Sequence, residues 1–147
     1  MEAAYEFRPY KPEDTAFIQS SWGSSFYKGL SYRHLLSPDS FHKFHRPARS
    51  KILEREDAKI IICAAKKDPS LIMAWLSLEQ PKNTEMMIVH YIYVKEAFKG
   101  EKLATALLSE INPRREVFYS HLTDKAQRII SRNHDKFKHW IYAPQLI

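Results

Sequence analysis

The sequence predicts a mixed α/β fold, in which a central sheet of antiparallel and parallel strands is flanked by helices. Three strand-like apolar runs, 58–67, 70–79 and 85–94, follow one another with only short turns between them, as in an antiparallel meander. An amphipathic helix (101–111) comes directly after the third run, and a further strand-like run (116–123) follows it. A crossover helix between two strands predicts a parallel pair, so both strand directions should occur in one sheet.

The first predicted elements are a short strand at residues 5–10 and a helix within 11–27. Glu13 and Asp14 suit the first turn of that helix, because the helix dipole favours negative charge there. One face of the helix carries four residues at helical spacing: Phe17, Ile18, Ser21 and Trp22. The segment 30–36 fits neither a helix nor a strand clearly.

A second helix is predicted over residues 37–55. Ser37 is placed to cap its N-terminus, and Pro38 suits the first helical position, where no amide hydrogen bond is lost. Pro47 lies inside the same stretch. Because proline lacks an amide donor and its ring crowds the preceding turn, we expect the helix to break or kink there.

The C-terminal part continues the alternation of strands and helices. Asn-Pro-Arg-Arg at 112–115 should end the crossover helix, and residues 116–123 should form a strand. A helix is then predicted over 123–133, with Thr123 as its N-cap, and a last strand within 138–146.

The composition indicates one folded domain that spans residues 1–147. Apolar residues make up 44% of the chain and aromatic residues 13%, which argues against disorder. Cys63 is the single cysteine, so an internal disulfide and a multi-cysteine zinc site are excluded and a reducing compartment is indicated. No run reaches the roughly 18 apolar residues of a membrane span, and the first residues lack the apolar segment of a signal peptide. We therefore expect a soluble, cytoplasmic protein.

The chain is basic, with a formal net charge of +6 and a pI of about 9.4. A basic field attracts polyanions, which fits nucleic acid, an anionic cofactor or an acidic partner without choosing among them. A soluble protein that is basic without any such partner is consistent with the same values.

The corner between the third strand and its helix has the chemistry of a phosphate site. The strand ends at Val94, and a basic turn that contains Gly100 leads into the helix. The first turn of a helix exposes free backbone amides, and its dipole favours an anion. Lys95, Lys99 and Lys102 add positive charge around the same point. The alternative is an ordinary βα corner, since one face of the helix carries normal core residues.

The segment 94–108, Val-Lys-Glu-Ala-Phe-Lys-Gly-Glu-Lys-Leu-Ala-Thr-Ala-Leu-Leu, resembles the cofactor-binding motif of the GNAT acyltransferase superfamily. In that family a strand ends in an aliphatic residue, and five positions later Arg or Gln opens the pattern R/Q-x-x-G-x-G/A at the start of a helix. Val94 matches the strand end, Lys99 the Arg/Gln position and Ala104 the final small residue. The predicted element order is similar to the GNAT fold over essentially the full length.

A narrower resemblance concerns two segments, Phe-Ile-Gln-Ser-Ser-Trp at 17–22 and His-Tyr-Ile-Tyr-Val-Lys-Glu-Ala-Phe-Lys-Gly at 90–100. They resemble uncharacterised GNAT-like proteins encoded by bacteriophages. On that resemblance the chain would be a viral protein acting in the cytoplasm of a bacterial host.

The GNAT resemblance implies that acetyl-CoA is a co-substrate and that no metal is needed. Backbone amides at the strand end and in the turn would hold pantetheine and pyrophosphate, and the residues concerned are Ile92, Tyr93, Val94, Lys99, Gly100, Glu101, Lys102, Leu103, Ala104 and Thr105. The middle glycine of the motif is Lys102 here, and Gly100 lies two positions too early to replace it. A long side chain there would either crowd the pyrophosphate or contact a phosphate itself as a point charge.

His90, four residues before Val94, is the candidate base. Strand alternation predicts His90, Ile92 and Val94 on one face of the sheet, with Tyr91 and Tyr93 on the other. A neutral imidazole accepts a proton at physiological pH. Arylalkylamine N-acetyltransferases of the family are similar at this position, where a histidine belongs to a base relay. The alternative is a buried histidine satisfied by the backbone.

GNAT members often carry a tyrosine that protonates the departing thiolate, but the matching position here is Ile130, which cannot donate a proton. Tyr119, His121 or Tyr142, in the strands that flank the following helix, are the candidate replacements, and packing roles are their alternative. Glu79 and Glu85 flank the turn before the third strand. We expect both side chains at a solvated hairpin end, and the alternative is that they act as a base through a water molecule.

Aromatic and basic side chains between the first helix and the second strand are candidates for binding the acceptor, because that region often lines the acceptor site in GNAT proteins. The candidates are Trp22, Tyr27, His42 and Arg46. A packed aromatic corner and an ordinary surface helix are the alternatives. His42 and His45 have i, i+3 spacing, but no carboxylate or cysteine at matched spacing completes a metal site. The basic segment 42–51 would also suit contacts with nucleic-acid phosphates.

These features predict an acetyl-CoA-dependent N-acetyltransferase that acts on an unidentified amine, either a small molecule or a protein side chain, as a monomer or homodimer. One alternative is a non-catalytic GNAT-fold binding or assembly protein, which Lys102 and Ile130 favour. Another is a nucleic-acid-binding or base-modifying protein, which the pI and the basic segment 42–51 favour. Affinity for CoA would argue against the first alternative. DNA affinity that falls steeply with salt would support the second.

Overall fold

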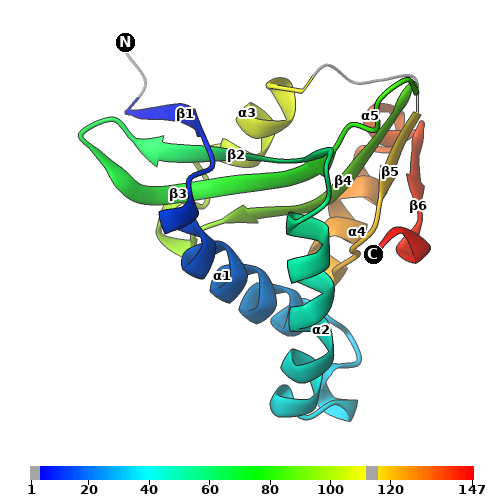
Figure 1. Ribbon diagram of the computed structural model, residues 1–147. Helices are drawn as coiled ribbons and strands as arrows, with labels where there is room; N and C mark the ends of the chain where they lie inside the picture. The colour runs from blue at the N-terminus through cyan, green and yellow to red at the C-terminus, as the bar shows by residue number, and fades with distance from the viewer. Residues whose placement is uncertain (1–3, 112–115) are drawn as a thin grey trace.

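The computed structural model describes residues 4–111 and 116–147, and its centre is a six-stranded sheet. The elements are β1 (Tyr5–Pro9), α1 (Thr15–Lys28), α2 (Pro38–Leu53), β2 (Ala58–Ala65), β3 (Asp68–Glu79), β4 (Met86–Val94), α3 (Leu103–Ser109), β5 (Glu116–Tyr119), α4 (Asp124–Arg132), α5 (His134–Phe137) and β6 (Trp140–Tyr142). The strands follow one another across the sheet in chain order. Helices α1 and α2 pack on one face and α3 on the other (Figure 1).

The sheet has the predicted mixture of strand directions. Strands β1 to β4 pair antiparallel, as the short turns between β2, β3 and β4 require. Strand β5 pairs parallel to β4 after the crossover through α3, and β6 pairs parallel to β5 after α4 and α5. The mixed α/β prediction is therefore confirmed, including the antiparallel meander and the parallel strand that follows it.

Two predicted helix caps are confirmed. The Ser37 hydroxyl accepts a hydrogen bond from the Ser40 amide at 3.1 Å and opens α2, and the Thr123 hydroxyl accepts one from the Ala126 amide at 3.1 Å and opens α4. Each hydroxyl satisfies an amide that has no acceptor within its own helix.

The helix does not break at Pro47, because α2 continues through it to Leu53. Pro47 and Lys43 both lie on the exposed side of the helix, so water can satisfy the Lys43 carbonyl that loses its amide partner. The segment 30–36 holds a single 3₁₀ turn at Arg33–Leu35. The predicted stop at 112–115 lies outside the described residues.

The core has one layer on each face of the sheet. On the α1–α2 side, Trp22 of α1 packs against Trp75 of β3 with ring centroids 5.6 Å apart, and both are fully buried. On the other side, Leu103 and Leu107 of α3 are buried against β3, β4 and β5. In the described part of the chain, no helix is long and apolar enough to cross a membrane.

A β-bulge interrupts β4 at His90. Val89 pairs with Leu78 and Tyr91 pairs with Ser77, so His90 is an extra residue without an opposite partner on β3. The bulge breaks the alternation of side chains. The prediction that His90 shares a face of the sheet with Ile92 and Val94 is therefore wrong. His90 bonds to Glu79 on the α1–α2 side of the sheet, whereas Ile92 and Val94 pack on the α3 side.

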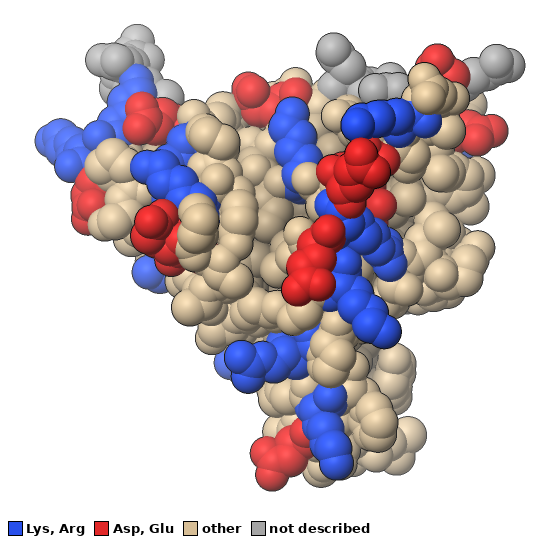
Figure 2. Space-filling view, viewed as in Figure 1, with Lys and Arg blue, Asp and Glu red and all other residues tan. Residues whose placement is uncertain are grey.

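Charged side chains on the face seen in Figure 2 are mixed in sign. Lysine and arginine side chains lie in small groups with acidic side chains beside them, including along α2. This view therefore shows no continuous basic stripe of the kind that follows a nucleic-acid backbone.

Candidate functional site

Strands β4 and β5 diverge in the middle of the sheet. Their pairing runs from Met86 opposite Glu116 to Val89 opposite Tyr119, and β4 continues to Val94 without β5 beside it. Because the Lys95 amide bonds to Met73 of β3 at 2.9 Å, and strand amides alternate in direction, the amides of Ile92 and Val94 point into the gap. The divergence thus leaves two backbone amide donors, those of Ile92 and Val94, on an edge of β4 that β5 does not cover.

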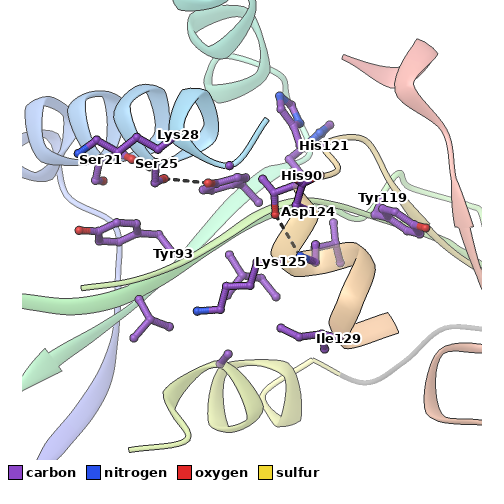
Figure 3. Close-up of a pocket in the computed structure, with 18 of the residues that line it drawn as sticks. Ser21, Ser25, Lys28, His90, Tyr93, Tyr119, His121, Asp124, Lys125 and Ile129 are labelled. Carbon is purple, nitrogen blue, oxygen red and sulfur yellow. Dashed lines mark hydrogen bonds between the residues drawn. The ribbon is translucent and has the colours of Figure 1, made fainter. Parts of the chain in front are cut away.

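A cavity of about 820 Å³ occupies this gap. In Figure 3, Ser21, Ser25 and Lys28 of α1 lie on one side, and Lys125 and Ile129 of α4 lie on the other. The predicted site residues that line it are His90, Ile92, Tyr93, Val94, Lys99, Ala104 and Tyr119. The structure therefore brings the candidate base and most of the predicted strand-end residues to one cavity.

The α1 side of the cavity is rich in hydroxyl groups, which the sequence reasoning did not single out. Ser20, Ser21, Ser24 and Ser25 all line it. The Tyr91 hydroxyl lies 2.8 Å from the Ser25 hydroxyl, and this bond joins β4 to α1 (Figure 3). Burial raises the pKa of Tyr91 to about 12, so Tyr91 is a neutral hydrogen-bonding group at neutral pH.

Three cations gather where α4 faces the turn after β4: Lys99, Lys125 and Arg128. The Lys99 ammonium pairs with Glu96 at 2.6 Å. Partial burial lowers the pKa of Lys125, and the neighbouring Lys99 lowers it further. The cavity as a whole is lined by four basic side chains, Lys28, Lys99, Lys125 and Arg128, and by two acidic ones, Glu96 and Asp124, so basic groups are in excess, which favours a bound anion.

The remaining residues of the turn lie away from the cavity. Gly100, Glu101, Lys102, Leu103 and Thr105 are not among its lining residues. Leu103 is buried in the core of the α3 face. Lys102 adopts the left-handed conformation, with φ 59° and ψ 31°, which is the region that glycine occupies at little cost. The turn thus keeps a backbone shape suited to glycine although the residue is lysine.

The candidate acceptor residues do not line the cavity. Trp22 is fully buried among aromatic rings, and the Tyr27 hydroxyl donates to the Leu36 carbonyl at 2.9 Å. His42 packs beside Tyr27, and Arg46 is exposed on α2. These side chains pack in or cover the corner between α1 and α2.

The two candidate tyrosines stack on each other, with ring centroids 5.4 Å apart. Tyr119 lines the cavity, whereas Tyr142 of β6 is half exposed and lines a second, apolar hollow beside α2. Burial raises the pKa of both hydroxyls, which keeps them protonated at neutral pH.

His90 is buried and fully hydrogen-bonded. Its Nδ1 lies 2.6 Å from the Ser120 hydroxyl and its Nε2 lies 2.5 Å from Glu79 Oε1. Glu79 is itself only 7% exposed and accepts from Arg55 at 2.7 Å, so it is not the solvated hairpin residue that the sequence predicted. Burial lowers the pKa of His90, which keeps the imidazole neutral.

Two further histidines, His121 and His45, extend the hydrogen-bond network of His90, and the sequence did not predict them as its partners. His121, at the end of β5, bonds to Ser120, and its Nε2 lies 3.1 Å from Nε2 of His45 on α2. Burial lowers the pKa of His121 to about 2 and that of His45 to about 3. No spacing in the sequence signals this cluster, because its members come from different elements. Within the described ranges, no group of three or more His, Cys, Asp or Glu side chains could hold a metal ion.

No family model matches the sequence, and no curated protein matches it. The structure, in contrast, matches solved acetyltransferases. A candidate acetyltransferase from Pyrococcus furiosus is 12% identical, with a TM-score of 0.65 over 88% of this chain and 91% of the other. A candidate acetyltransferase from Bacillus subtilis is 12% identical, with a TM-score of 0.63 over 89% of each chain.

The PaiA N-acetyltransferase from Thermoplasma acidophilum, solved in complex with coenzyme A, is 15% identical, with a TM-score of 0.53 over 90% of this chain and 75% of the other. Across eight of the matching structures, this chain covers between 62% and 93% of the other chain. At such low identity the likeness establishes the fold, which is that of the GNAT acetyltransferases.

Proposed function

We propose that this protein transfers an acetyl group from acetyl-CoA to an amine. The observation that carries the proposal is the divergence of β4 from β5, which leaves the amides of Ile92 and Val94 directed into a cavity. A strand edge of this kind binds an extended chain with amide groups, and pantetheine is such a chain. The CoA complex of a structural neighbour supports the same reading.

The phosphates of the co-substrate fit the cationic end of the cavity. Lys99, Lys125 and Arg128 line it. Lys102 does not line the cavity, so its side chain does not crowd a pyrophosphate there. The departure from the family glycine at this position is therefore compatible with binding.

The transfer itself needs few groups. The amine nitrogen attacks the thioester carbonyl, the C–N bond forms, the C–S bond breaks, CoA leaves as a thiolate, and the proton that the nitrogen loses passes to solvent. A strand amide that donates to the carbonyl oxygen would stabilise the charge that develops on it. A thiol has a pKa of about 8.5, so its anion is a good leaving group without a proton donor, and Ile130 in place of tyrosine does not prevent the reaction.

Calorimetric titration with acetyl-CoA tests the proposal. We expect saturable binding by the wild-type protein and roughly tenfold weaker binding by Lys99→Ala, because one charge-assisted contact to a phosphate is lost. Lys59→Ala, on the exposed side of β2, is the matched control and should bind as the wild type does. Absence of both heat and a thermal shift at millimolar acetyl-CoA would rule out the proposed function.

A further inference from the structure

A second hollow, which we call the α2 hollow, is lined by residues within 26–36, by α2 between residues 40 and 48, by Ser120 and by residues within 142–147. Its volume is about 510 Å³, which is in the range of recognition sites. No described residue lines both this hollow and the larger cavity. The two adjoin at a ring pair, because Tyr119, which lines the cavity, stacks on Tyr142, which lines the hollow. The α2 hollow is therefore a separate feature of the surface.

The α2 hollow gathers most of the large apolar side chains that the fold leaves exposed. Among the described residues seven such side chains are exposed, and four of them line the hollow: Tyr32 (50%), Phe44 (78%), Tyr142 (45%) and Ile147 (40%). Single exposed apolar side chains are common on folded proteins, but a group of them around one concave surface marks a place where a ligand or a partner binds.

The sequence of α2 explains why this surface is left open. Ser40, Phe41, Phe44, His45 and Ala48 all line the hollow, and their i, i+1, i+4, i+5, i+8 spacing places them on one side of the helix. Phe41 is partly buried against Phe26 of α1, with ring centroids 6.0 Å apart. Phe44 lies farther out and stays exposed. The fold thus buries the inner edge of this helix side and leaves the outer edge uncovered.

Basic side chains border the apolar surface. The lining residues of the α2 hollow include no lysine or arginine. Between residues 32 and 53, however, four exposed side chains are basic and one is acidic: Arg33, Lys43, Arg46 and Lys51 against Asp39. Within the described ranges none of these four basic side chains pairs with a carboxylate. An apolar centre with a basic rim complements a partner that presents an apolar group flanked by acidic ones.

We propose that the α2 hollow is a docking site for an acidic protein segment, which inserts a large apolar side chain beside Phe44 and Tyr142. The concave apolar surface receives a side chain in the way that interface pockets hold anchor residues. The unpaired basic rim supplies the charge complementarity and selects acidic segments. This inference does not depend on the proposed acetyl transfer.

Two other occupants fit the surface less well. A second copy of this chain, in a two-fold contact, would bring its own basic rim against this one, and like charges would face each other. A nucleic acid needs cations that follow its backbone, but basic and acidic side chains alternate along α2 in Figure 2. An acidic protein segment meets neither difficulty.

Three labelled peptides test the proposal by fluorescence anisotropy with the full chain at low salt. The first is Glu-Glu-Leu-Phe-Glu-Glu-Leu-Leu-Glu-Glu, the second carries lysine at every glutamate, and the third carries serine at every leucine and phenylalanine. We expect the first peptide to bind roughly tenfold more tightly than either of the others. Its affinity should fall as salt is added, because the charged rim contributes to binding.

Variants of the protein locate the binding. Phe44→Ser should weaken binding of the first peptide by about tenfold, because an aromatic anchor contact is lost. Ile141→Ser is the matched control, since Ile141 is 48% exposed on β6 and does not line the hollow. Lys43→Glu should weaken binding by roughly fivefold, and Lys59→Glu, on the exposed side of β2, should leave it unchanged.

The outcomes decide among the possible occupants. Equal affinity for the acidic and the basic peptide, no binding of the first peptide at about millimolar concentration, or wild-type affinity in Phe44→Ser overturns the proposal. Self-association that Phe44→Ser abolishes would assign the hollow to a second copy. Binding to vesicles of phosphatidylcholine and phosphatidylglycerol that Phe44→Ser abolishes, without binding of the first peptide, would assign it to a lipid surface. If a variant fails to fold, the three peptides with wild-type protein still decide.

Discussion

The guanidinium of Arg49 occupies the space that a β-carbon on residue 23 would fill. An ideal β-carbon at Gly23 lies 2.9 Å from both terminal nitrogens of Arg49. The glycine in α1 thus lets Arg49 of α2, only 3% exposed, reach Gln19 at 2.8 Å and His45 at 2.5 Å. One missing side chain therefore permits both the close approach of two helices and the buried hydrogen bonds of Arg49.

Gly23→Ala should destabilise the protein, although alanine is the better helix former by about 1 kcal/mol. The new methyl group must displace Arg49, which leaves buried polar partners unsatisfied. We expect the free energy of unfolding to fall by about 1–3 kcal/mol, measured by urea denaturation. In an Arg49→Ala background the same change should be neutral or stabilising. Equal effects in both backgrounds would show that Arg49 is not the obstacle.

Lys102→Gly should stabilise the protein. Lys102 has φ 59°, a conformation that costs an L-residue with a β-carbon but not glycine. Relief of that strain should outweigh the greater freedom of glycine in the unfolded chain, for a net gain of about 0.5 kcal/mol in the free energy of unfolding. Lys102→Ala, which removes the charge and keeps the β-carbon, is the control and should give no gain. A loss of stability in the glycine variant would contradict the argument.

The order of elements was predictable because its signals are local. The three apolar runs of β2, β3 and β4 are joined by short turns, and Ser37 and Thr123 are strong caps at the expected positions. The motif after Val94 singled out Val94 and Lys99, and both of them line the cavity. Such features depend on residues within one or two turns of each other.

The chemistry beside the cavity was less predictable because it depends on long-range contacts. The bulge that redirects His90 appears only when β4 is paired with β3. His45, His121 and Glu79 belong to different elements, and no periodicity links them. Glu79 resembles a solvated hairpin residue in the sequence, and only Arg55 and His90 in the folded protein explain its burial.

Lys125→Ala should separate binding from stability. Burial lowers the pKa of Lys125 and the nearby Lys99 lowers it further, so the two ammonium groups repel each other when no anion is bound. Removal of Lys125 should leave the free energy of unfolding unchanged or slightly higher. It should also weaken acetyl-CoA binding by roughly five- to tenfold, as calorimetry can show, because a phosphate loses one cation. The loss should shrink in high salt. Equal affinity for the variant and the wild type would place the phosphates elsewhere.

Acid should destabilise the fold at pH values well above those at which carboxylates titrate. The pKa values of His121 and His45 are lowered to about 2 and about 3, against about 6.5 in an unfolded chain. Below pH 6.5 the unfolded chain therefore binds protons that the folded protein does not, and stability is full above this pH and falls as the pH drops. From pH 7.5 to 5.5 we expect a loss of about 2 kcal/mol in the free energy of unfolding, since each such group contributes up to about 1.4 kcal/mol per pH unit and His45 is partly exposed.

Histidine variants identify the source of that loss. His121→Gln cannot take up a proton in either state, so its free energy of unfolding should change about half as much between pH 7.5 and 5.5. His34→Gln, at an exposed position, should keep the wild-type slope. Asp14, which pairs with Arg8, does not affect this measurement. Arg8 lowers the pKa of the Asp14 carboxyl, so the contribution of Asp14 to the free energy of unfolding is lost only below about pH 4. A wild-type slope in His121→Gln would mean that the folded protein binds a proton at His121 as readily as the unfolded chain does, which would contradict the lowered pKa of His121.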